Sequence, residues 1–177
     1  MATYLLSKAL PMVSAENKPI CEWTYRDIQT LPPDQQKEWR KACTTELDML
    51  RQRDVFELVN APRGHKVINN CWVFDVKPNG HKWARLVAKG FSQVKGIDFD
   101  QVFSPVVQFK TVRLMLALAS IKNWHIKGLD VQSAYLYGKL DEEIYMKQHE
   151  GFAVKGQEHT VLYLKHALYG LKQAGLA

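Results

Sequence analysis

The sequence predicts an α+β fold in which helices and short strands alternate along the chain. Two apolar stripes with helical spacing, within residues 34–51 and 106–120, predict the helices. Short runs rich in β-branched and aromatic residues predict the strands. The clearest pair is 67–76 and 83–87, because Pro78-Asn79-Gly80 between them is a strong turn signal. We expect this pair to form a β-hairpin.

Composition limits the class of protein. The chain has 177 residues, of which 46% are apolar, so it can bury a real core. Its net charge of +6 allows a nucleic-acid partner without requiring one. Cys21, Cys43 and Cys71 form neither a zinc-type pair nor an even disulfide framework, so we expect reduced thiols in an intracellular protein, cytoplasmic or nuclear. Lys8 and Pro11 interrupt the N-terminal apolar stretch, which argues against a signal peptide, and no run is long enough to span a membrane.

The remaining elements follow in chain order. Residues 1–30 have no sustained period and are expected to be an arm or linker before a domain at 31–177. The first helix is expected to start at Pro32-Pro33, with Asp34 as its N-cap. Further along, the expected elements are a strand at 55–59, an irregular segment at 90–100, a strand at 126–131, a loop at 141–143, strands at 144–147 and 161–164, and a helix from residue 168.

Four basic side chains lie on the predicted hairpin, namely Lys77, Lys82, Arg85 and Lys89. They form either a solvated surface or a grip for phosphate groups, because a guanidinium can bind an anion through two N–H groups. A two-residue loop makes Lys77 face Lys82 and puts Arg85 on the opposite face. A three-residue loop with a bulge puts Lys77 and Arg85 on one face, which suits a shared phosphate site better. The sequence leaves both registers open.

Asp130 stands at the end of the apolar run 126–131. An acid at the end of a buried strand needs a charged partner, and carboxylate and carbonyl oxygens are ligands that Mg²⁺ accepts. The alternative is a helix N-cap, because an aspartate before Gln132-Ser133-Ala134 can accept hydrogen bonds from free N–H groups. Taken alone, this stretch favours the cap.

A series of short motifs covers the chain from Trp39 to Ala174 at natural spacing. Besides Trp39, Ala42, Glu46 and Leu50, they are Phe56-Glu57-Leu58-Val59, Cys71-Trp72-Val73-Phe74, Ala84-Arg85-Leu86-Val87-Ala88-Lys89-Gly90-Phe91, Gly96-Ile97-Asp98-Phe99, Phe103-Ser104-Pro105-Val106-Val107, Arg113-Leu114-Met115-Leu116-Ala117-Leu118-Ala119, Leu129-Asp130-Val131, Glu143-Ile144-Tyr145-Met146, Gly151-Phe152 and Leu168-Tyr169-Gly170-Leu171-Lys172-Gln173-Ala174. In this order they resemble the reverse transcriptase of Ty1/copia-type LTR retrotransposons, in its N-terminal fingers-and-palm part.

The resemblance implies a partial right-hand polymerase, with fingers at about 31–122 and the start of an antiparallel palm sheet at about 123–177. It implies an RNA or DNA template–primer and a dNTP as partners, no membrane, and two Mg²⁺ ions that activate the primer hydroxyl and neutralise the phosphate. Asp130 resembles the first metal-binding aspartate, and the backbone carbonyl of Val131 is expected to contact a metal as well.

Four further residues resemble parts of the nucleotide site. Arg85, with Lys77 as the weaker candidate, resembles the basic residues that hold the triphosphate. Tyr135 stands where the family places an aromatic ring beneath the incoming sugar, although a packed palm tyrosine is an equal alternative. Gln173 lies in the motif that lines the nucleotide and template site.

The chain also departs from the family pattern. The second acidic motif, an aromatic-x-Asp-Asp, does not occur, and no Asp-Asp pair exists anywhere in the 177 residues. Because one aspartate cannot hold two divalent ions, we expect the chain to be inactive alone. Asp75 and Trp83 stand where the family commonly has Lys, and His149 stands where it commonly has Pro.

Three functions therefore stay open. The first is a reverse transcriptase fragment that is inactive alone, the second a non-catalytic module that binds nucleic acid or docks on a polymerase, and the third a truncated relic without activity. A palm strand left without its neighbour is expected to support self-association, because open strand edges and exposed apolar surface both promote it.

Overall fold

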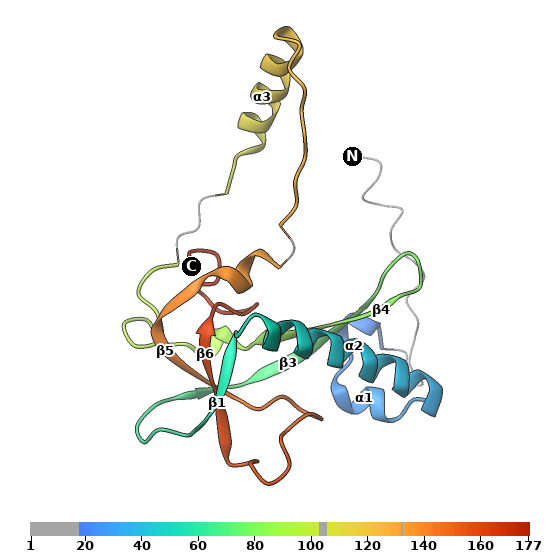
Figure 1. Ribbon diagram of the computed structural model, residues 1–177, viewed down its shortest axis with the longest axis vertical. Coiled ribbons are helices and arrows are strands. Elements are labelled where there is room, and N and C mark those ends of the chain that lie inside the picture. Colours follow the sequence, from blue (N-terminus) through green and yellow to red (C-terminus); the bar gives the residue numbers. More distant parts are fainter. Residues whose placement is uncertain (1–17, 103–105, 132) are drawn as a thin grey trace.

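The computed structural model describes residues 18–102, 106–131 and 133–177, and it has the mixed α+β character that the sequence predicts (Figure 1). In order, the elements are η1 (Ile20–Glu22), α1 (Tyr25–Gln29), α2 (Pro33–Gln52), β1 (Phe56–Asn60), β2 (Val67–Ile68), β3 (Asn70–Val76), β4 (Lys82–Ala88), η2 (Gly90–Ser92), α3 (Phe109–Ile121), η3 (Ala134–Tyr137), β5 (Lys139–Lys147) and β6 (Thr160–His166).

Six strands form two sheets within the described residues. The larger sheet has the order β1-β6-β5-β2, with antiparallel pairs except for the short parallel contact between β2 and β5. The smaller sheet is the hairpin β3-β4, which was predicted from its turn signal. β2 pairs only with Tyr145 and Met146, so the first half of β5 has no strand neighbour on that side within the described part of the chain.

One hydrophobic core joins the two sheets to α2. The helix contributes Trp39, Cys43, Leu47 and Leu50, which recur at helical spacing and are fully buried. The hairpin contributes its alternate residues, among them Phe74 and Leu86, and the larger sheet contributes Ile144, Met146, Leu162 and Leu164. As Figure 1 shows, α2 runs alongside the hairpin, so this helix holds the two strands in place.

The N-terminal part of the described chain is attached to this core. Residues 1–17 lie outside the described residues, and the arm expected there stays a prediction. Residues 18–30 contain η1 and α1, and they bury Trp23, Tyr25 and Ile28. Trp23 packs against Trp39 with ring centroids 6.0 Å apart, so this stretch is part of the folded unit.

Three local expectations are wrong. Asp34 lies in the first turn of α2 and does not cap it, because the helix begins at Pro33, a residue that fits the first position well. Residues 141–143 belong to β5 and are not a loop. The helix expected from residue 168 is a series of turns, because Gly170 adopts φ +90°, which no right-handed helix contains.

α3 and the segment after it stand away from the core. Figure 1 shows α3 standing apart from the two sheets, with the extended stretch after it running back along the helix toward them. The helix was predicted, but of its expected stripe only Ala119 is buried. The strand that was expected to end at Asp130 does not form, because a strand needs a paired neighbour and no described strand pairs with this stretch.

Candidate functional site

The hairpin has the register that places Lys77 and Arg85 on one face. Val73 lies opposite Arg85, and the amide of Lys77 donates to the carbonyl of His81 at 3.0 Å, so the loop has three residues, 78–80. Side chains alternate along a strand, which puts both basic residues on the face away from the core. Lys77 is four residues along the hairpin from Val73, the residue opposite Arg85. At about 3.3 Å per residue, the two basic residues therefore lie about 13 Å apart along the strands.

Arg85 lies between two aromatic rings. Its guanidinium carbon is 4.2 Å from the centre of the Trp83 ring and 3.9 Å from that of Tyr169. Such contacts attract the cation to the ring faces and restrict its rotamers. The Nε atom of Arg85 is buried, with no hydrogen-bond partner within the described residues.

Tyr135 is brought to the same place from another part of the chain. It stands on η3, half-exposed, and its ring packs edge-on against Tyr169 with centroids 5.8 Å apart. The backbone supports this meeting, because the carbonyl of Tyr169 accepts a hydrogen bond of 2.7 Å from the amide of Ala88. Gly170 allows the approach, since a Cβ there would overlap the carbonyl oxygen of Ala88. Arg85, Tyr135 and Tyr169 thus form one cluster, here called the Arg85 cluster.

A buried carboxyl group lies beneath this cluster. Glu46 of α2 is 6% exposed, and its Oε1 has no hydrogen-bond partner among the described residues. Burial raises the pKa of Glu46, an effect that the amide of Leu86 and the charges of Arg85 and Arg53 partly offset. Arg53 in turn lies over the Tyr137 ring at 4.8 Å. Glu46 therefore has two arginines among its neighbours, and its raised pKa favours the neutral carboxyl form, which leaves the charge of Arg85 uncompensated by this group.

Gln173 lies inside a buried amide network. Its Nε2 donates to the carbonyl of Asp98 at 2.8 Å and to Glu142 at 3.2 Å, and its Oε1 accepts from Gln93 at 3.0 Å. Gln93 also accepts from the amide of Lys172 at 2.9 Å. The side chain is 4% exposed, so in this structure its polar atoms serve the junction between residues 90–100 and the C-terminal turns.

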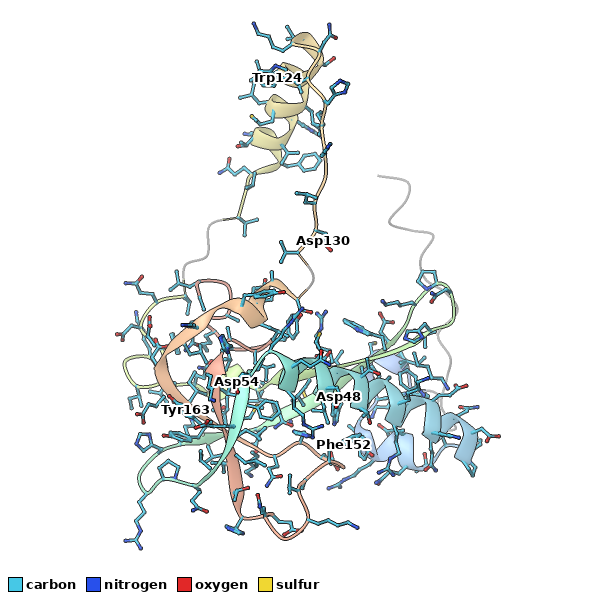
Figure 2. All side chains as sticks on the ribbon, viewed as in Figure 1. Asp48, Asp54, Trp124, Asp130, Phe152 and Tyr163 are labelled. Carbon is cyan, nitrogen blue, oxygen red and sulfur yellow. The ribbon has the colours of Figure 1, made fainter. Side chains whose placement is uncertain are left out.

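Asp130 and Val131 lie apart from the other predicted residues. Figure 2 shows Asp130 on the extended stretch that leads back from α3, away from Asp48 and Asp54 in the body. Both residues are exposed. Among the described residues, no three His, Cys, Asp or Glu side chains come close enough to hold a metal ion.

Sequence reasoning did not single out three residues of this region. Tyr169 belonged to a recognised motif, but its contact with Arg85 joins distant segments and has no local signal. Glu46 did carry a signal, because a carboxylate within the apolar stripe of α2 indicates a buried acid. Gln93 lay in a segment expected to be irregular, where a buried amide has no periodic pattern.

Comparison with known proteins gives the family. A family model described as reverse transcriptase (RNA-dependent DNA polymerase) matches residues 53–177. The chain is 43% identical over 151 residues to the retrovirus-related Pol polyprotein from transposon TNT 1-94 of Nicotiana tabacum, covering 82% of this chain and 11% of that protein. It is 39% identical to the retrovirus-related Pol polyprotein from transposon RE1 of Arabidopsis thaliana, covering 78% of this chain and 10% of that protein. It is 36% identical to the Ty1-BL Gag-Pol polyprotein of Saccharomyces cerevisiae, covering 62% of this chain and 6% of that protein. No solved structure matches.

The chain belongs to the reverse transcriptase family of copia-type retrotransposon Pol polyproteins. It spans about a tenth of the length of the plant relatives that it matches. Members of this family act on a nucleic-acid template–primer and use divalent metal ions. Within residues 18–102, 106–131 and 133–177, no helix is both long enough and apolar enough to cross a membrane.

Proposed function

We propose that this chain is the fingers and the first part of the palm of a right-hand reverse transcriptase, and that it binds nucleic acid without polymerising alone. In this division the fingers comprise about 31–122 and the palm begins at about 123. The observation that carries the proposal is the Arg85 cluster, in which a guanidinium packs on the rings of Trp83 and Tyr169, and Tyr169 in turn packs against Tyr135.

Arg85 supplies the anion contact in this proposal. A guanidinium that stacks on aromatic rings keeps its edge available for phosphate oxygens. Tyr135 presents its ring beside this contact, where it packs against a sugar. Lys77 lies too far along the hairpin to share a phosphate group easily and has the lesser role. Gln173 acts through its network, by holding residues 90–100 against the turn that carries Tyr169.

The metal chemistry of the family is incomplete here. Asp130 and the Val131 carbonyl are the proposed Mg²⁺ ligands, but these two residues alone do not make a two-ion site. The described residues hold no acidic cluster that could complete it. We therefore propose that Asp130 is dispensable for nucleic-acid binding.

Binding of an RNA/DNA hybrid tests this proposal. Fluorescence anisotropy with a labelled template–primer should show an affinity that falls as salt rises, because phosphate contacts release counterions. Arg85→Ala should weaken binding several-fold, whereas Asp130→Ala should leave it unchanged. Lys139→Ala, a change of another exposed cation, is the control for net charge. Binding that is absent at low salt, or that depends on Asp130 and not on Arg85, contradicts the proposal.

A second proposed property is self-association through the palm edge. The first half of β5 lacks a strand neighbour beside β2, and such an edge presents unpaired N–H and C=O groups. The polymerase-docking alternative uses the same edge, with a longer polymerase chain as its partner.

A further inference from the structure

A groove separates α2 from the distal half of the hairpin. It has a volume of about 440 Å³, which is within the range of ligand sites. One wall is the outer surface of α2, and the other is β4 with the hairpin loop. The side chains that matter for binding are Lys41, Met49, Lys77, His81 and Trp83. We call this feature the α2–β4 groove.

We propose that the α2–β4 groove binds a single-stranded nucleic-acid segment, with Lys41 and Lys77 on its phosphates and an unpaired base against Trp83. The inference rests on the proposed function, because it concerns the same nucleic-acid partner. It adds a second contact surface, which adjoins the Arg85 cluster at Trp83, and it gives Lys77 a role there.

The accessible charge of the groove is positive. Of its two acids, Glu38 is neutralised by Lys82 at 2.5 Å. The other acid, Glu46, buries its Oε1 and contributes little surface to a ligand. Lys41 and Lys77 are exposed, and neither has an ion-pair partner in the described part of the chain. The two lysines come from opposite walls, so a polyanion that lies along the groove can contact both.

The apolar part of the groove favours a flat ring over an extended acidic chain. Trp83 lines the groove, and Arg85 packs on its ring at 4.2 Å, which limits the motion of the indole. Ala42, Met49 and Ala84 complete the apolar lining. Aromatic side chains between cations are the usual way to bind unpaired bases without sequence preference. A duplex keeps its bases stacked inside, so this surface is specific for single strands.

The experiment uses the full 177-residue chain and a fluorescein-labelled 12-nucleotide single strand of mixed sequence. Lys41→Ala/Lys77→Ala should lower the slope of log affinity against log salt by about 1.4, since each single-strand phosphate contact contributes about 0.7. Lys95→Ala/Lys155→Ala removes the same charge from exposed sites outside the groove and should change the slope less. Trp83→Ala should weaken binding roughly 5- to 150-fold, and Trp83→Phe should restore most of it. Circular dichroism melts of each variant establish that it is folded.

The outcomes separate this inference from the proposed function. If Lys41→Ala/Lys77→Ala loses single-strand binding and keeps hybrid binding, the groove is a distinct surface as proposed. Trp83→Ala is compared on the single strand alone, because it also removes a ring that packs on Arg85. If the groove pair behaves like the control pair, or if poly-glutamate displaces the strand as well as poly-uridylate does, the inference is overturned while the Arg85 cluster stands. If the unmodified chain binds neither probe at low salt, the proposed function fails as well.

Discussion

His149 is a buried histidine with no polar partner. It is 4% exposed, and neither of its ring nitrogens has a hydrogen-bond partner in the part of the chain that the structure describes. Its neighbours are the rings of Phe56, Trp72 and Phe152, with centroids 6.1 to 6.2 Å away. Burial, with a smaller contribution from the charge of Arg51, lowers the pKa of His149 from 6.5 to about 4. The fold therefore holds this imidazole in its neutral form.

This burial makes the stability of the protein depend on pH. The folded pKa lies below the unfolded one, so the unfolded state binds the proton first as the solution is acidified. The contribution of His149 is complete above pH 6.5 and is lost as pH falls toward 4, a loss of roughly 3 kcal/mol. Urea denaturation at a series of pH values should show this decrease, and His149→Phe should remove it. His65→Gln, at an exposed histidine, should leave it in place; equal pH dependence in both variants contradicts the account.

At the scale of elements, local patterns predicted most helices and strands and the β3-β4 pair, but not the register of that pair. Pro78-Asn79-Gly80 predicted the hairpin turn, yet loops of two and three residues agreed equally well with the sequence. The structure has the three-residue loop, which decides the face of every side chain beyond it. The prediction of a C-terminal helix was wrong because Gly170 lies against the carbonyl of Ala88, and this tertiary contact overrides the local helical pattern.

α3 is the element whose surroundings disagree most with its composition. Phe109, Leu114, Met115 and Ile121 are between 55% and 76% exposed, although a helix that is apolar on all sides is normally buried. Apolar surface on this scale promotes association, because water is released when two such surfaces meet. The helix should therefore drive the chain into oligomers.

Polar substitutions on one face of α3 should reverse this behaviour. Leu114→Gln/Ile121→Gln changes two residues that are 59% and 76% exposed and that lie on one side of the helix. We expect light scattering to show a smaller apparent mass and less dye binding to apolar surface, with an unchanged melting temperature. Lys110→Gln/Thr111→Gln is the matched control on the same helix. An unmodified chain that is monomeric at micromolar concentration contradicts this prediction.

At the scale of the whole molecule, the site depends on contacts between distant segments. Arg85 could be predicted as a site residue from its motif. Its contacts with Trp83 and Tyr169 could not be predicted, because they require β4 and the C-terminal turns to meet. Tyr135 was predicted with two alternative roles, and the structure places it in contact with the turn that carries Tyr169. Asp130 shows the opposite case, because this matched motif residue stands apart from Asp48 and Asp54 (Figure 2) and belongs to no group of three possible metal ligands among the described residues.

Primer extension is the measurement that tests the central claim most directly. The reaction contains the 177-residue chain with an RNA template, a DNA primer, dNTPs and Mg²⁺, at a concentration where anisotropy shows the hybrid to be bound. We predict full binding with no incorporation above a protein-free control, since Asp130 alone cannot hold two metal ions. Incorporation that is robust and disappears in Asp130→Ala would show that the chain completes a metal site, and would contradict the account.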